Sequence, residues 1–178
     1  VAADYVIDPA HTSIHFRVDH FRFSKVQGRF NNIRGVFTFD PAKPMASNVR
    51  VVVDVGSIDT NHTERDAHMR GPEYFDVAQF PAAVFQSTGI VVTGERTGEM
   101  TGDLSIFGTT IPVRLAVVFN GIAPHPLGDQ FDRYRGVVVA GFSARATIKR
   151  SSFGMTAGGG EKGDAAELSI EVEGWRRP

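Results

Sequence analysis

The fold of this chain is decided by the stretch Ile14-His15-Phe16-Arg17-Val18-Asp19, in which apolar and polar side chains alternate without a break. Strict alternation is typical of a β-strand with one face in a hydrophobic interior and the other in water. The even-numbered residues would point inward and the odd-numbered residues outward. Because a strand needs hydrogen-bonded neighbours, the rest of the chain has to supply similar strands.

The same period of two recurs along the chain. Val49–Val55 has its odd positions apolar, and Phe37 and Phe39 share one face of a further strand. Other apolar residues at alternate positions, which we expect to point inward, are Leu104, Ile106, Val113, Leu115, Val117, Phe119, Phe142, Ala144, Ala146, Ile148, Leu168, Ile170 and Val172. Turn signals separate these runs at Asp40-Pro41, Thr93-Gly94, Phe107-Gly108 and Ala157–Asp164. About eight strands with short connections predict an all-β fold, an antiparallel barrel of the up-and-down type.

Length and composition limit the possible functions. The 178 residues are enough for one core, and we expect a single domain over residues 1–178. A net charge of −1 gives no field that would attract nucleic acid, and no run approaches the roughly eighteen apolar residues of a transmembrane segment. Without cysteine there are no disulfides and no zinc–thiolate sites. The 14 Phe, against 3 Tyr and 1 Trp, imply a very dry core or a cavity with dry walls.

One segment, Ser57–Arg70, interrupts the alternating pattern with a dense group of polar and ionisable residues. Asn61 followed by Glu64 resembles a capping box, and the stretch to Arg70 can be helical. Gly71-Pro72 would end that helix. Because strands flank the segment, we expect a helical lid or side element on the barrel.

On such a helix, His62 and Asp66 would be neighbours at i and i+4, as would Glu64 and His68. Two carboxylate–imidazole pairs could act as acid and base, bind a metal or hold the polar head of a ligand. The commoner role of such residues is a salt-linked network, which here would fix the lid to the barrel rim. No metal site is predicted, because the two histidines lie six residues apart and off a single helical face.

Two further features bear on ligand binding. His20 shares the apolar parity of its strand, so it is either a core histidine or a ligand contact. Small residues at inward positions, Gly35, Ala144 and Ala146, leave space that a small ligand could fill in an eight-stranded barrel. The pattern Gly158-x-Gly160-x-x-Gly163 matches a dinucleotide-binding motif only formally, because a strand follows it, and we expect a surface turn.

The chain also resembles a known family, the YceI-like family of bacterial periplasmic, lipocalin-like proteins. The resemblance runs nearly end to end. The residues that carry it are Tyr5-Val6-Ile7-Asp8, His11-Thr12-Ser13, His20–Phe30, Gly35–Asp40, Ser57–His62, Glu64-Arg65-Asp66, His68, Arg70, Phe80-Pro81, Phe85-x-Ser87, Thr101-Gly102-Asp103-Leu104, Gly108 and Pro112. The chain departs from the family in Gly121–Arg135, which is longer than expected and rich in proline and charge.

The resemblance implies an extended, eight-stranded, lipocalin-like barrel with a short helical side element and a long interior tunnel. It further implies that the tunnel takes a polyisoprenoid or similar lipid, such as a ubiquinone or a polyprenyl lipid, and that a homodimer is possible. Family members are typically exported to the periplasm. The start Val1-Ala2-Ala3-Asp4 fits this expectation, because its small residues suit a chain whose signal peptide has been removed.

From these observations we expect a binding protein for transport, storage or sequestration, with no catalytic residue, no metal and no cofactor other than the bound isoprenoid or quinone. The expected tunnel wall consists of Phe16, Val18, Phe30, Phe37, Phe39, Val51, Val53, Phe85, Leu104, Leu115, Phe119, Phe142, Ala144 and Ile170. The residues expected to meet a polar head group are His20, Asn61, His62, Arg65 and Asp66. Two alternatives remain: a lipid-site enzyme that uses His62, Asp66 and His68, and a stress-related scavenger of small amphiphiles.

Overall fold

The computed structural model describes residues 1–159 and 163–178. In this part of the chain, eleven strands form one antiparallel sheet that closes on itself. The strands are β1 (Ala3–Ile7), β2 (Ser13–His20), β3 (Ser24–Phe30), β4 (Ile33–Phe39), β5 (Asn48–Asp54), β6 (Ile58–Asp59), β7 (Ala82–Val92), β8 (Thr97–Ile106), β9 (Thr109–Pro124), β10 (Val138–Lys149) and β11 (Ala165–Arg176). One α-helix, α1 (Thr63–Arg70), and the 3₁₀ turns η1 (Pro44–Ala46), η2 (Val55–Ser57), η3 (Asp132–Tyr134) and η4 (Arg150–Phe153) complete the described part.

The eleven strands make eight passes of the chain. β1 and β2 are two parts of one bent pass, because both lie on the same edge of β11. β3 and β4 form the next pass in the same way, since β3 pairs with β2 and β4 pairs with β1. β5 continues through η2 into β6, and each later pass pairs with the one before it. The predicted eight-stranded, up-and-down antiparallel barrel with a short helix is therefore confirmed.

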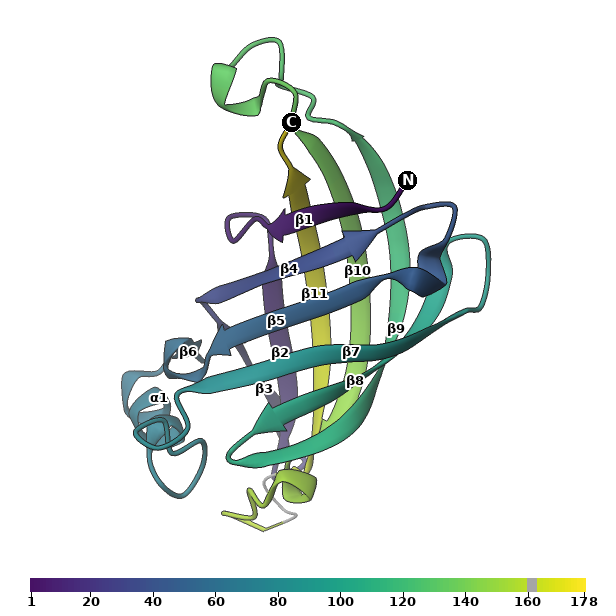
Figure 1. Ribbon diagram of the computed structural model, residues 1–178. Helices are drawn as coiled ribbons and strands as arrows, with labels where there is room; N and C mark the ends of the chain where they lie inside the picture. Colours follow the sequence, from purple (N-terminus) through teal and green to yellow (C-terminus); the bar gives the residue numbers. More distant parts are fainter. Residues whose placement is uncertain (160–162) are drawn as a thin grey trace.

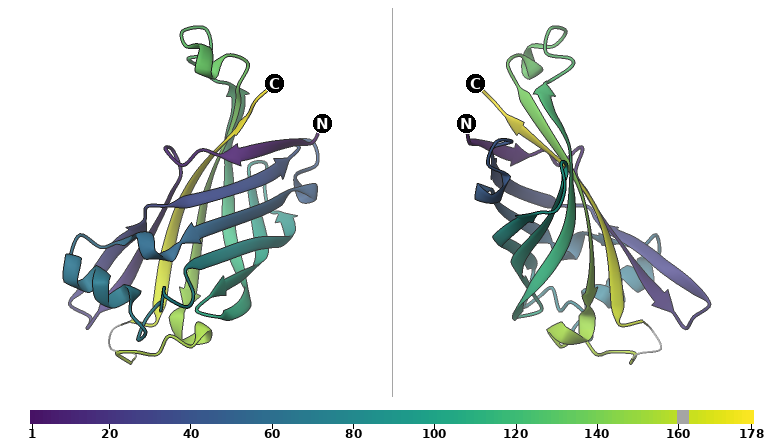
Figure 2. Two further views of the ribbon diagram at one scale, coloured as in Figure 1. Left: turned by 60° about the vertical axis from the view of Figure 1, so that its left-hand side comes forward. Right: turned by 90° about the vertical axis from the view of Figure 1, so that its right-hand side faces the viewer.

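The barrel is flattened and splayed. β1, β4, β5, β7 and β8 cross over β2, β10 and β11 as two walls (Figure 1). Figure 2 shows that the walls lie close together near the two termini and diverge toward the opposite end, where α1 sits beside β6.

Two clusters of buried side chains hold the walls together. Near the termini, the stacked rings of Tyr5 and Phe37 have their centroids 5.0 Å apart, and Phe37 and Phe39 both meet Phe142 edge to face. The second cluster lies toward the other end. It consists of Ile33, Val53, Val55, Ala83, Ile106, Phe153 and Met155. Such aromatic and aliphatic contacts make a rigid frame, because interiors pack at crystal-like density.

The connections between the strands agree with the sequence in part. The helix and its end at Gly71 are confirmed, but its N-cap is His62 rather than Asn61. The segment between β9 and β10, where the family resemblance weakens, protrudes beyond the barrel and carries η3 (Figure 1). Of the predicted glycine-rich turn, residues 160–162, which include Gly160 of the formal dinucleotide motif, lie outside the described residues.

Candidate ligand-binding cavity

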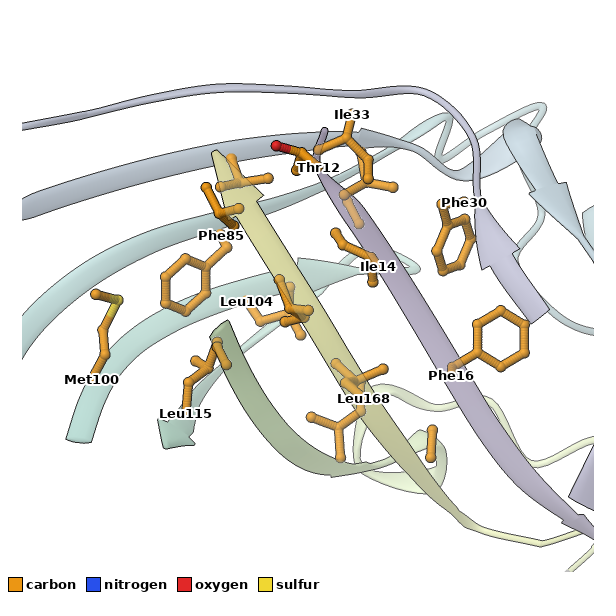
Figure 3. A pocket seen from close by; sticks show the side chains of 18 of the residues that line it. Thr12, Ile14, Phe16, Phe30, Ile33, Phe85, Met100, Leu104, Leu115 and Leu168 are labelled. Carbon is orange, nitrogen blue, oxygen red and sulfur yellow. The ribbon is translucent and has the colours of Figure 1, made fainter. Parts of the chain in front are cut away.

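The barrel encloses a cavity of about 780 Å³. This volume falls in the range of about 300–1,000 Å³ that is usual for small-molecule sites. The side chains that point into it come from opposite walls and are almost all apolar, as Figure 3 shows for Phe16 and Ile14 of β2, Phe85 of β7, Leu115 of β9 and Leu168 of β11. The interior therefore contains a cavity with apolar walls, flanked by the two clusters of buried side chains. The barrel is not filled by side chains.

The rings of three inward-facing phenylalanines pack against glycines of the sheet and so leave the middle of the cavity open. The ring of Phe16 lies against Gly28, that of Phe85 against Gly102, and that of Phe37 against Gly174. A Cβ atom at any of these glycines would overlap the ring that covers it. The absence of a side chain thus lets each ring lie flat on the sheet, where a glycine often marks such a close approach.

The structure places all the expected wall residues on the cavity surface. They are Phe16, Val18, Phe30, Phe37, Phe39, Val51, Val53, Phe85, Leu104, Leu115, Phe119, Phe142, Ala144 and Ile170. Alternation found them because side chains at every second position share one face of a strand. Their contact with a ligand stays a prediction.

One end of the cavity reaches the surface between β2 and α1, where the exposed residues His20 and His62 line it together with Arg65. His62 Nδ1 accepts a hydrogen bond from the backbone N–H of Arg65 at 3.2 Å, which caps the helix. The Arg65 guanidinium donates to the hydroxyl and the carbonyl oxygen of Thr60, both at 2.7 Å. His20 is exposed at the end of β2, so it is a residue of the opening and not a core histidine.

Two of the expected head-group residues do not line the cavity. Asp66 is buried, and its Oδ1 accepts hydrogen bonds from the backbone N–H and the hydroxyl of Thr60, at 2.9 and 2.5 Å. Asn61 is exposed and has a backbone φ of 60° in the tight turn before the helix. Asp66 therefore fixes α1 to the barrel rim, which is the network role expected of such residues, and contact of Asp66 or Asn61 with a ligand stays a prediction that the cavity lining does not support.

The expected carboxylate–imidazole pairs do not form either. His68 Nε2 lies 2.7 Å from Glu73 Oε2 rather than against Glu64, and His62 is engaged by the Arg65 backbone. Among the described residues, no hydrogen bond joins His62 or His68 to Asp66. The pair of His62 and Asp66 does not form because His62 precedes the first helical residue and its side chain turns back to cap the helix. Glu64 and His68 are both helical, but His68 pairs instead with Glu73, which follows the helix.

Sequence reasoning missed a second opening of the cavity. The turn between β7 and β8, with Glu95, Arg96 and Thr97, is exposed and lines the cavity together with Pro41 and Pro44, which follow β4. The Arg96 guanidinium stands 5.9 Å from the centre of the Phe119 ring and donates to the backbone oxygen of Asn120 at 3.0 Å. The Thr93-Gly94 signal indicated a turn, but nothing in it told which end of the barrel the cavity would reach.

A further polar group lies outside the cavity, at the bend between β1 and β2. Asp8, His11 and Glu173 each contribute one side-chain oxygen or nitrogen atom to a group whose atoms lie within 4.8 Å of one another. His11 Nδ1 is 2.5 Å from Asp8 Oδ2, and Trp175 Nε1 donates to Glu173 Oε1 at 3.1 Å. The hydrogen bond to Asp8, followed by the charge of Glu173, raises the pKa of His11 above its ordinary value, although partial desolvation opposes them. We interpret the group as a structural link between the two passes.

The chain matches a family model described as a YceI-like domain over residues 5–174. It belongs to the YceI-like family. It is 40% identical to a UPF0312 protein of Azotobacter vinelandii, in an alignment that covers 99% of this chain and 89% of that protein. It is 38% identical to a UPF0312 protein of Pseudomonas aeruginosa, with 99% and 89% covered.

Solved structures show the same fold. The YceI protein of Campylobacter jejuni has a TM-score of 0.77 at 28% identity, with 90% of this chain and 91% of that chain covered. BcnA of Burkholderia cenocepacia has a TM-score of 0.81 at 22% identity, with 94% and 98% covered. A polyisoprenoid-binding domain of Saccharophagus degradans has a TM-score of 0.65 at 16% identity, with 98% of both chains covered. In the described part of this chain, no helix has the length and apolar character needed to cross a membrane.

Proposed function

We propose that this protein binds the hydrocarbon chain of a long isoprenoid lipid inside the barrel. The observation that carries the proposal is the apolar cavity of about 780 Å³, which reaches the surface at two places. Membership of the YceI-like family supports it, as does the name of the Saccharophagus degradans domain, which shares the fold and is described as polyisoprenoid-binding. The wall is almost entirely apolar, with Thr12 a polar exception, so a hydrocarbon chain fits it better than a polar substrate does.

The cavity volume sets the length of chain that fits inside. If each heavy atom takes about 30 Å³, the space that a water molecule occupies in the liquid, the cavity holds about 25 heavy atoms. That number corresponds to roughly five isoprene units. At about 0.3 kcal/mol per heavy atom, binding would contribute about −8 kcal/mol, which is close to a micromolar dissociation constant. A longer chain would leave the barrel through one of the openings.

The opening between β2 and α1 is the place for a polar head group. Two of the Arg65 nitrogens are bonded to Thr60, and within the described chain no hydrogen bond or ion pair engages its Nη1. His20 and His62 line the same opening. A guanidinium and two imidazoles could donate hydrogen bonds to a quinone carbonyl or to a polyprenyl phosphate.

As for its biological role, we propose an exported, periplasmic protein that carries, stores or sequesters a ubiquinone or a polyprenyl lipid. Binding, not catalysis, is the proposed activity, because the group formed by His62, Asp66 and His68 is not assembled for acid–base chemistry. Association into a homodimer is part of the same proposal. A scavenger of small amphiphiles would differ from it by preferring short ligands over long ones.

The test is lipid retention in a blocked barrel. Ala144 lines the cavity, and Ala144→Trp should place an indole across it. Ala116 is exposed on the neighbouring strand, opposite Arg145, so Ala116→Trp is a matched control on the outer face. Mass spectrometry of organic extracts from freshly purified protein should find a stoichiometric isoprenoid with the wild type and with Ala116→Trp. A folded Ala144→Trp protein should yield none, and normal retention by that variant would refute the proposal.

A further inference from the structure

The hairpin between β2 and β3 ends in two exposed aromatic side chains. Phe23 is 89% exposed and Phe21 is 38% exposed. Phe21 has one aromatic neighbour among the described residues, the ring of His20, at 4.6 Å between centroids. Arg22 stands between the two phenylalanines and Lys25 follows them. A phenylalanine exposed to water at a loop tip lacks the burial that normally stabilises it. We therefore expect Phe21 and Phe23 to contact a binding partner.

The backbone of this tip is strained. The turn is closed by a hydrogen bond from Phe23 N–H to His20 O at 3.0 Å, and Asp19 Oδ2 accepts from Arg22 N–H at 3.0 Å. Both central residues have positive φ, 51° at Phe21 and 63° at Arg22. Asn-Gly is the usual choice for such a turn, because side chains with a bulky Cβ substituent disfavour this conformation. A strained turn made of Phe-Arg keeps these side chains at the tip, and strain of this kind is often linked to function.

The tip adjoins an opening of the cavity. Val18, Asp19 and His20 of β2 and Val26 of β3 all line the cavity, and they form the stem of the same hairpin. The hairpin extends away from the barrel at the end where the walls diverge (Figure 2). A surface that Phe21 and Phe23 contact would therefore face the opening between β2 and α1.

We propose that the segment Phe21–Phe23 docks on the surface of a phospholipid bilayer and so brings the opening of the cavity to the lipid. Phenylalanine rings insert at the boundary between headgroups and acyl chains, while the Arg22 guanidinium sits at the level of the phosphates. Lys25 Nζ lies 3.5 Å from Glu167 Oε1 and is paired there, so Arg22 is the cation that suits anionic headgroups. The inference rests on the proposed function, since a bilayer is the place where an isoprenoid would enter or leave the barrel.

The test measures binding of the full chain to vesicles of phosphatidylethanolamine and phosphatidylglycerol by co-sedimentation. Phe21→Ser combined with Phe23→Ser should weaken binding by roughly tenfold or more, because it removes both apolar anchors. Phe131→Ser is the matched control, since Phe131 is 46% exposed in the connection between β9 and β10, at the other end of the barrel. Equal binding by the wild type and the double variant, or no binding by the wild type, would overturn the proposal.

A second measurement separates this proposal from the one on which it rests. Uptake of a short isoprenoid alcohol from solution, without vesicles, should be the same for the wild type and the double variant, whereas uptake from vesicles should be slower for the variant. A wild type that binds vesicles but takes up no isoprenoid would retain the docking surface and refute the proposed function. A wild type that takes up isoprenoid but does not bind vesicles would support the proposed function and refute the docking of Phe21–Phe23 on a bilayer. A dimer lost in the double variant, without vesicle binding, would make the tip a protein contact and overturn docking.

Discussion

Glycines opposite phenylalanines set the width of the cavity. Where Phe85 covers Gly102, the ring occupies the place of a side chain and leaves the middle of the barrel free. Gly28 and Gly174 do the same for Phe16 and Phe37. At these three positions the wall is smooth because a ring lies on a bare glycine backbone.

Gly102→Val should narrow the cavity by forcing the Phe85 ring inward. We expect about tenfold weaker isoprenoid binding and a loss of about 1–3 kcal/mol in unfolding free energy, since overpacking strains a well-packed wall. Gly121→Val is the matched control, because nothing lies within 4 Å of a Cβ built there. Titration with a soluble isoprenoid and urea denaturation of both variants measure the two effects. Unchanged binding by Gly102→Val would contradict this account of the wall.

Alternation identified the wall residues, whereas of the five residues expected to meet a head group, three line the cavity (His20, His62 and Arg65) and two do not. Phe16 and Leu115 follow from alternation, because the period of a strand fixes which side chains share a face. Asp66 and Asn61 do not follow from it, since their directions depend on which residue begins the helix. His62 took the capping place expected for Asn61, and the orientation of the whole polar cluster changed with it.

Among the elements, the bend between β1 and β2 has its own stabilising contact. His11 bonds to Asp8 and lies 4.0 Å from Glu173 of β11, so it links two passes of the barrel. Because the folded-state pKa of His11 is raised, its contribution is fully present below the unfolded value of about 6.5 and is lost as pH rises through the folded value. The side chain is 58% exposed, so solvent screening keeps this contribution below about 1 kcal/mol.

His11→Ala should therefore lower the melting temperature more at about pH 5.5 than at about pH 8.5. His15→Ala is the control, because His15 is also exposed on this pass and takes part in no ion pair of the described residues. Thermal unfolding followed by circular dichroism at the two pH values gives the difference. A larger loss at the higher pH would show that His11 does not act through its charged form.

At the scale of the whole molecule, the sequence predicted eight passes, and the structure has them. It did not predict that three of these passes are split into two strands each. The splits fall at Asp8–Thr12 and at Asn31-Asn32, which interrupt the alternation, but the pattern does not report that the next strand continues the same pass. The second opening of the cavity was missed because alternation shows which side chains face inward and not where the cavity reaches the surface.

Affinity should depend on chain length up to the capacity of the cavity and not beyond it. In a series of isoprenoid alcohols of increasing length, we expect binding to tighten until about 25 carbon atoms are inside and then to level off. Displacement of one fluorescent lipid by each member of the series measures this. Affinity that falls sharply beyond that length would mean that the barrel is closed at one end.

A cavity with two openings sorts its ligands by thickness and not by length. A closed pocket acts as a ruler, because its floor stops every chain that is too long. In this barrel the walls limit only the cross-section of the chain that passes between Phe16 and Phe85. The remainder of a long chain lies outside the barrel. A protein built in this way would serve cells whose isoprenoids differ in the number of units, with no change in its own sequence.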